Sequence, residues 1–167
     1  MIELIFIIIV FIVVVIIFEF FFGKSGSKPQ KYRYKQKEFF MSRAEHECYN
    51  ALVIAVGDKY HVFPQVHLSS IVDNKVVGQN WKSAFRHTSQ KSVDFVLCDK
   101  EYISPKLAIE LDDKTHERED RIERDEEVGR VLREAKLPLL RLVNQGQQFD
   151  PQDLIQKITG VLDTLRL

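Results

Sequence analysis

Acidic residues interrupt two short apolar segments in the middle of this chain, where a buried strand normally carries none. Asp94 lies inside the segment Val-Asp-Phe-Val-Leu, and Glu110 and Asp112 follow the segment Leu-Ala-Ile. Successive side chains of a strand point to opposite faces, so Glu110 and Asp112 are expected on the same face. If the two segments pair, Asp94 can approach them, and converging carboxylates repel one another unless a cation lies among them.

Oxygen ligands of this kind favour a hard divalent cation, and the sequence therefore predicts a Mg²⁺ or Mn²⁺ site formed by Asp94, Glu110 and Asp112. Such an ion can activate water and stabilise negative charge on a phosphodiester. A second interpretation needs no metal, because Asp112 can be a turn residue after its strand. In that interpretation Asp94 is a buried, hydrogen-bonded acid, and the residues alone leave both interpretations open.

The elements that must hold these acids are two strands, predicted at residues 93–98 and 107–112. They are separated by a short polar connection, so we expect them to form a hairpin. The preceding segment, residues 68–91, has a mixed pattern. Its two aromatic residues, Trp81 and Phe85, are expected to contact the core.

A helix and a strand are predicted upstream of the hairpin. Ser42 and Glu45 form a capping-box pattern, and apolar residues then recur at helical spacing to about Gly57. The segment that follows, residues 60–68, alternates as a strand does. Its Pro64 cannot donate a ladder hydrogen bond, which indicates an edge strand or a bulge.

Downstream of the hairpin the pattern predicts a charged amphipathic helix over residues 117–136, because its apolar residues mark one helical stripe. Pro138 opens a last strand, in which Arg141 is expected to pair with one of the acids or to contact a phosphate. Asp150-Pro151 is typical of a helix start and precedes a final amphipathic helix. The predicted order is helix, three strands, helix, strand, helix.

The overall charge argues neither for nor against a nucleic-acid partner, because the distribution of charge matters more than its sum. The chain has 24 basic and 24 acidic residues among its 167 residues, so no general excess of positive charge indicates binding to nucleic acid. It has no glycine-rich phosphate loop and no serine nucleophile elbow. The two cysteines, Cys48 and Cys98, are far apart and are expected to be buried thiols of a reduced protein.

Five segments of the chain together resemble a known family. They are S-x-x-E at residues 42–45, VDFV at 93–96, AIELDDKTH at 108–116, Arg-Asp in the charged helix, and PLLRL at 138–142. The pattern resembles bacterial domain-of-unknown-function family 2726, which is placed in the PD-(D/E)XK nuclease-like superfamily. The resemblance covers roughly residues 40–145 and implies an α/β fold with a restriction-endonuclease-like core.

The resemblance also implies roles for individual residues. Asp94 matches the motif aspartate, Glu110 matches the acidic residue of the signature, and Glu45 matches a glutamate of the first helix that often completes such sites. Glu45 is equally expected as the capping-box acid. One position departs from the pattern, because Asp112 stands where the signature lysine is expected.

The missing lysine leaves two functions open. In the first, the domain hydrolyses nucleic acid, DNA rather than RNA, with Mg²⁺ or Mn²⁺ at its acids. His116 then replaces the lysine, as in mismatch-repair-type endonucleases that this segment resembles, and Lys91 and Lys114 are other substitutes. In the second, the domain is a non-catalytic module that binds nucleic acid or a protein partner. Substrate preference, oligomeric state and pathway do not follow from the sequence.

The N-terminal region has a separate character. Residues 4–22 are apolar except for Glu19, which predicts a transmembrane helix. Six basic residues between 24 and 37 follow it and place the C-terminal domain in the cytoplasm, with the N-terminus outside. We therefore expect a single-pass protein of the bacterial inner membrane. Its predicted parts are a transmembrane helix (1–23), a basic linker (24–40) and a nuclease-like domain (41–167).

Overall fold

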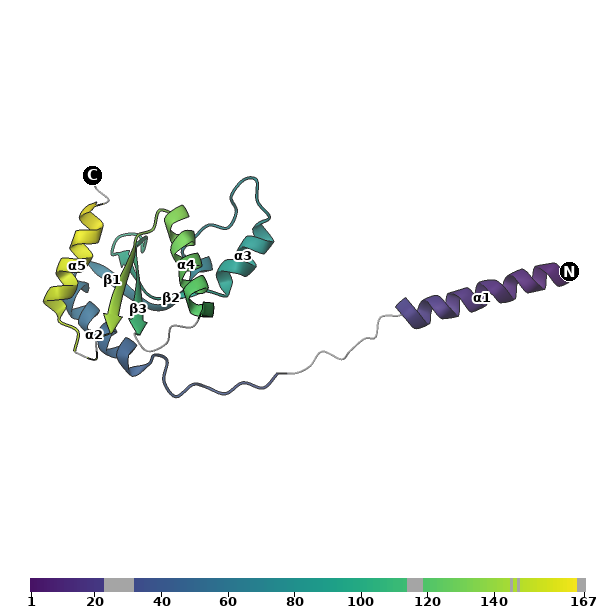
Figure 1. The fold of residues 1–167 in the computed structure, drawn as a ribbon, viewed down its shortest axis with the longest axis horizontal. Coiled ribbons are helices and arrows are strands. Elements are labelled where there is room, and N and C mark those ends of the chain that lie inside the picture. Colours follow the sequence, from purple (N-terminus) through teal and green to yellow (C-terminus); the bar gives the residue numbers. More distant parts are fainter. Residues whose placement is uncertain (23–31, 114–118, 145, 147, 165–167) are drawn as a thin grey trace. The chain divides into compact units, whose positions relative to one another are not determined.

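The computed structural model describes residues 1–22, 32–113, 119–144, 146 and 148–164; for residues 2, 19–22, 113 and 119–125 it describes the backbone alone. The chain divides into two compact units, Met1–Glu38 and Phe39–Leu167. The first unit contains one helix, α1 (Ile2–Phe22). The second unit contains all the strands that are described (Figure 1).

The expected transmembrane helix is not supported by α1. Within the described part of the chain, no helix combines the length and apolarity needed to cross a membrane. This finding contradicts the predicted single-pass location in the bacterial inner membrane, with its external N-terminus and cytoplasmic domain.

The second unit is a mixed α/β domain built on a four-stranded sheet in the order β1-β2-β3-β4. Strands β1, β2 and β3 are antiparallel neighbours, and β4 runs parallel to β3. Helix α4 connects β3 to β4, as a parallel connection requires. The elements are α2 (Arg43–Val56), β1 (Tyr60–His67), a 3-10 turn η1 (Leu68–Ser70), α3 (Trp81–Ser89), β2 (Ser92–Asp99), β3 (Pro105–Asp113), α4 (Glu119–Glu134), β4 (Leu139–Asn144) and α5 (Pro151–Thr164).

The sheet has one apolar cluster on each face. On one face, Phe95 and Ile109 pack with Leu52 of α2 and Leu154 of α5. The members of the other cluster come from η1, the strands and α4; they include Leu68, Val96, Ala108, Val128 and Leu132. Helices α2 and α5 therefore cover one face and α4 covers the other (Figure 1).

The predicted hairpin and edge strand are confirmed. Phe95 pairs with Ile109 and Leu97 with Leu107, so the two strands that carry the acids are antiparallel neighbours. Strand β1 lies at the edge of the sheet and contains Pro64, which needs no ladder donor there. Both cysteines are buried free thiols, as expected.

The capping box of α2 is also confirmed. The Ser42 hydroxyl accepts a hydrogen bond from the Glu45 amide (3.3 Å), and the Glu45 carboxylate accepts one from the Ser42 amide (2.6 Å). These two bonds satisfy backbone donors that the first turn of a helix otherwise leaves open. The helix ends at Val56, and Gly57 is its C-cap residue.

The expected core contacts of Trp81 and Phe85 are wrong. Each residue is 48% exposed. The buried residue of α3 is Thr88, whose hydroxyl donates a hydrogen bond to the Asn74 side chain (2.8 Å). Trp81, Phe85 and Thr88 lie at positions i, i+4 and i+7 and so share one helical stripe, but only Thr88, near the C-terminal end of the helix, is buried.

The turn between β2 and β3 is held by Asp99. Its carboxylate accepts hydrogen bonds from the amides of Tyr102 (2.9 Å) and Ser104 (3.2 Å) and pairs with Lys106 (3.0 Å). The Tyr102 amide and the Lys106 ammonium, which favour the charged form, lower the pKa of Asp99 from 3.8 to about 2.

This depressed pKa gives a prediction for the pH dependence of stability. Asp99 stabilises the folded state above its unfolded pKa, and that contribution is lost as the pH falls from about 4 towards 2. We expect the melting temperature of the wild type to fall more steeply across this window than that of Asp99→Asn. Lys106→Gln should be intermediate, and identical slopes for wild type and Asp99→Asn would contradict the assignment.

Candidate active site

One polar residue on each strand lies at the same level of the sheet. Glu110 pairs directly with Arg141 of β4. Since Phe95 pairs with Ile109, continuing this register by one residue brings Asp94 level with Glu110. On the edge strand, Pro64 pairs with Phe95 and Val66 pairs with Val93. Gln65, between them, therefore lies across from Asp94. We refer to Gln65, Asp94, Glu110 and Arg141 as the polar row.

Ion pairs of Arg141 join β3 to β4. One guanidinium nitrogen of Arg141, Nη2, lies 3.1 Å from Oε2 of Glu110, and the other, Nη1, lies 3.4 Å from Oδ1 of Asp112. Glu110 is buried, whereas Asp112 and Arg141 are more than a third exposed on their side chains. Burying a carboxylate costs free energy unless a partner compensates its charge, and Arg141 provides that charge.

Glu110 and Asp112 lie on the face of the sheet that α4 covers. Ala108, two residues before Glu110, packs in the cluster with Val128 and Leu132 of α4. Because side chains alternate along a strand, Glu110 and Asp112 share the face of Ala108. The prediction that these two acids point the same way is consistent with this arrangement, and the predicted pairing of Arg141 with a site acid is confirmed.

Asp94 takes the place of a ladder acceptor. The Ala108 amide donates towards β4, to the carbonyl of Pro138 (2.9 Å). Successive amides of a strand point to opposite neighbours, so the Leu111 amide, three residues after Ala108, points towards β2. There Oδ2 of Asp94 accepts a hydrogen bond from it (2.7 Å). Asp94 is therefore a hydrogen-bonded acid, as the interpretation without metal expects, but it is part-buried rather than buried, and this bond does not exclude a further role.

Cys48 of α2 is a buried free thiol. Burial, and secondarily the negative charge of Asp94, raise the pKa of the Cys48 thiol to about 12. The thiol therefore stays protonated at neutral pH and is not a nucleophile.

Glu45 is engaged through both of its oxygens. Oε2 accepts the Ser42 amide in the capping box, and Oε1 accepts a hydrogen bond from the Gln65 side chain at 2.8 Å. Gln65 has a φ of 52°, a left-handed conformation that is uncommon for a residue other than glycine. Of its two expected roles, Glu45 has the capping role in the structure, and a catalytic role remains a prediction.

The sequence analysis missed Gln65. The available signal was a polar residue directly after Pro64, inside a strand with apolar neighbours. Its left-handed backbone and its bond to Glu45 connect the edge strand to α2. A polar residue at a strand irregularity next to a site is a useful indicator, since irregularities of this kind often reorient a side chain.

The carboxylates fit Mg²⁺ or Mn²⁺ in their chemistry, because both ions prefer oxygen ligands. Their geometry fits less closely. Within the described residues, no three or more His, Cys, Asp and Glu side chains form a group that could hold a metal ion. Arg141 already lies against two of the predicted ligands, Glu110 and Asp112. His116 lies outside the described residues, as do Lys114 and its neighbours up to 118.

A positively charged pocket opens beside Arg141. It has a volume of about 640 Å³, and its lining includes Arg133 and Lys136 together with Arg141. Three cations around one pocket favour an anionic ligand. The carboxylates of the polar row and this pocket therefore meet at Arg141.

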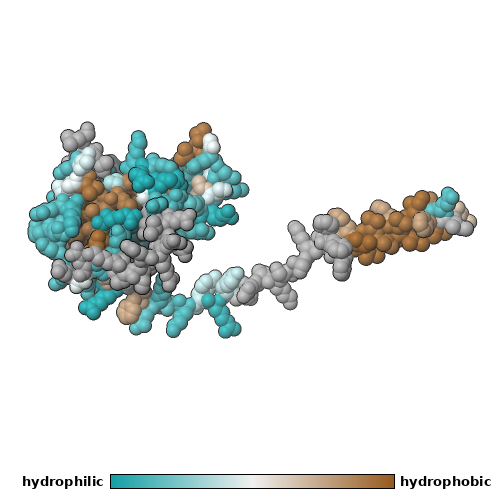
Figure 2. Space-filling model, viewed as in Figure 1, coloured by the Kyte–Doolittle hydropathy of each residue, from teal (hydrophilic) through white to brown (hydrophobic). Residues whose placement is uncertain are grey.

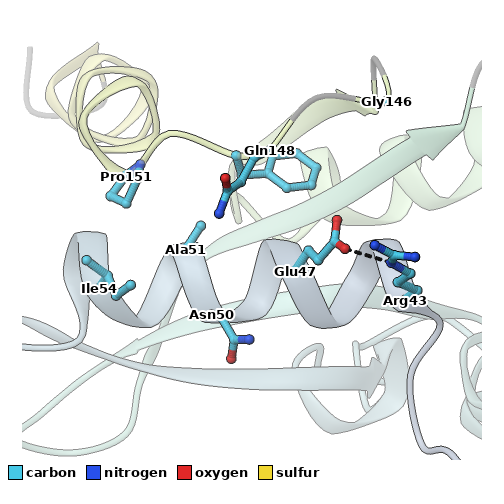
Figure 3. Close-up of a pocket in the computed structure, with 9 residues that line it drawn as sticks. Arg43, Glu47, Asn50, Ala51, Ile54, Gly146, Gln148 and Pro151 are labelled. Atoms are coloured by element: carbon cyan, nitrogen blue, oxygen red, sulfur yellow. Dashed lines mark hydrogen bonds and ion pairs between the residues drawn. The ribbon is translucent and has the colours of Figure 1, made fainter.

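A second pocket lies between α2 and the segment that leads into α5 (Figure 3). Its volume is about 540 Å³, and Arg43 and Glu47 form an ion pair of 2.9 Å at one end. None of the predicted site residues that the structure describes lines it. This pocket therefore does not extend the candidate site formed by the polar row.

Comparison with known proteins gives one result for the whole domain. The family model described as "Protein of unknown function (DUF2726)" matches residues 37–161. The chain belongs to this family. The match spans the elements from α2 to most of α5, so it includes every residue of the polar row. No curated protein and no solved structure matches the chain.

The bond between Asp94 and the Leu111 amide gives a stability prediction. Asp94→Asn keeps a side-chain oxygen that can accept this amide, whereas Asp94→Ala leaves a part-buried donor without its acceptor. We expect Asp94→Ala to lower the free energy of unfolding by about 1–3 kcal/mol. Asp94→Asn should cost less than half as much in urea denaturation. Equal losses in the two variants would show that the bond does not stabilise the hairpin.

Proposed function

We propose that this domain is a metal-dependent phosphodiesterase with a PD-(D/E)XK nuclease-like fold, acting on nucleic acid, and on DNA rather than RNA. The observation that supports it most is the polar row, in which Asp94 and Glu110 occupy neighbouring strands at one level. The order of elements also agrees with a restriction-endonuclease-like core: a helix, an antiparallel three-stranded meander, a helix and a parallel strand. The fold alone is an analogy, so the site must carry the function.

In this proposal Asp94, Glu110 and Asp112 hold Mg²⁺ or Mn²⁺. The ion, when bound, supplies an activated water and compensates charge on the phosphodiester. Arg141, Arg133 and Lys136 bind the phosphates through the pocket that they line. His116, at the end of the same signature segment, accepts a proton from the water in place of the missing lysine.

Arg141 has a specific part in this proposal, because its guanidinium compensates the charge of Glu110 and Asp112. A metal ion and this guanidinium would compete for the same two carboxylates. A divalent cation therefore binds only if Arg141 gives up at least one of its contacts. The released guanidinium would then be available to a phosphate at the pocket beside it.

The second candidate is a non-catalytic module that binds nucleic acid or a protein partner. It is favoured by the same contact, since Arg141 makes Glu110 and Asp112 part of an ion-pair network that needs no metal. The aspartate at position 112, where the superfamily signature has a lysine, favours it as well. The two candidates differ in what removal of Arg141 should do.

Calorimetric titration of Mn²⁺ into the full-length chain tests the proposal. If the carboxylates bind metal, Glu110→Gln and Asp94→Asn should each weaken binding by at least about tenfold, since each removes a charged ligand. Arg141→Gln should strengthen binding several-fold, because a competing cation is removed. Arg43→Gln, which removes an arginine that is 94% exposed in an ion pair with Glu47, serves as the matched control.

Cleavage of labelled DNA and RNA, with Mn²⁺ or Mg²⁺ present, completes the test. The wild type should cleave, whereas Glu110→Gln, Asp94→Asn and His116→Ala should lose activity while remaining folded. If neither the wild type nor Arg141→Gln binds Mn²⁺, with or without DNA, the enzyme is excluded and the non-catalytic module is the better account.

A further inference from the structure

Helix α3 and the loop before it expose apolar side chains on the surface. Val76 is 58% exposed and Val77 is fully exposed at 101%, and Trp81 and Phe85 are 48% exposed each. Apolar atoms gather at the tip of the loop that precedes α3 (Figure 2). Within the described part of the domain these residues pack against neither apolar cluster of the sheet. Such a grouped exposure indicates an interaction surface.

Cations are interleaved with the aromatic rings of this surface. Lys82 and Arg86 each follow an aromatic residue, and Lys75 and Lys91 lie at the two ends of the segment. Between residues 71 and 91 Asp73 is the one acidic residue in the sequence, although the whole chain carries no net charge. The ammonium of Lys82 lies 5.9 Å from the centre of the Trp81 ring. The surface is therefore both aromatic and positively charged.

We propose that this surface, Lys75–Lys91, binds single-stranded nucleic acid. Trp81 and Phe85 are four residues apart on one helical face, where two rings can each stack on a base. Lys75, Lys82, Arg86 and Lys91 then contact the phosphates. Charge complementarity decides between occupants, because an apolar protein partner would leave Lys82 and Arg86 desolvated beside the rings without compensation.

The chain leads directly from this surface to the polar row. Lys91 precedes β2, and Asp94 is the third residue of that strand. Helix α3 is also tied to α4, since His87 and Glu127 lie 3.1 Å apart. If single-stranded nucleic acid is also the substrate, that conclusion rests on the function proposed above. Binding itself requires neither metal nor hydrolysis.

The single tryptophan of the chain makes the test specific, because all tryptophan fluorescence comes from Trp81. The full-length chain is titrated in EDTA with a single-stranded oligonucleotide of about 16 nucleotides and with the duplex of the same sequence. We expect the single strand to quench Trp81 fluorescence and to bind more tightly than the duplex. EDTA prevents metal-dependent hydrolysis, so failure of cleavage and failure of binding remain separate results.

Variants identify which groups bind, with a labelled oligonucleotide as the probe. Trp81→Leu and Phe85→Leu keep every charge, and each should weaken single-strand affinity about tenfold. Lys82→Gln and Arg86→Gln should each make the salt dependence of log K shallower by about 0.7. Tyr102→Leu and Lys100→Gln, exposed residues of the turn between β2 and β3, are the matched controls. The basic residues at 24–37 are unchanged in all these variants, so they cannot account for a difference.

Three results would overturn the proposal. The first is unchanged affinity of Trp81→Leu and Phe85→Leu for the single strand. The second is a Trp81 response to vesicles of anionic lipid but not to the oligonucleotide, which would assign the surface to lipid. The third is a Trp81 signal that depends on protein concentration alone, which would assign it to a second copy of the chain.

Discussion

The ion-pair network of Arg141 with Glu110 and Asp112 is the interaction on which the candidate site depends. Glu110 is buried in the second half of β3, and a buried carboxylate needs a compensating charge. Arg141 can provide it because β4 lies parallel to β3 with Arg141 in register with Glu110. That register exists because α4 returns the chain to the same end of the sheet. The crossover, the sheet order and the charge of the site are therefore linked.

The other polar groups of the site are also part of the fold. Asp94 accepts the Leu111 amide as a backbone carbonyl would, and Glu45 caps α2 while it accepts a bond from Gln65. Each of these acids thus has a structural role that accounts for its position without a metal. A catalytic role would use groups that the fold already orients, which is how precise sites are usually supported.

Sequence patterns predicted the sheet well because it is made of contiguous apolar segments with clear ends. The hairpin, the edge strand with Pro64, the capping box of α2 and the pairing of Arg141 with a site acid all agree with the structure. In these cases, local chemistry determines the result. An acid within an apolar strand needs a hydrogen-bond donor or a cation beside it. Proline has no backbone N–H to donate to a neighbouring strand and is therefore found in edge strands.

The failures concern properties that depend on the surroundings of a residue. Trp81 and Phe85 were expected in the core from their apolarity, but which face of a short helix is buried depends on tertiary packing. Gln65 was missed because its importance comes from a left-handed backbone and a neighbour twenty positions away in the sequence. The apolar N-terminal segment predicted a membrane span, which the described part of α1 does not supply. Ligand geometry likewise could not follow from the acids alone, since their spacing does not reveal that Arg141 lies against two of them.

The most direct measurement is a crystal structure of the protein with Mn²⁺, using the anomalous signal of the metal. The account predicts an anomalous peak bounded by Asp94, Glu110 and Asp112, with Arg141 turned away from at least one of its two carboxylates. Saturating Mn²⁺ that gives no peak there, with Arg141 still contacting both Glu110 and Asp112, would contradict a metal-dependent site.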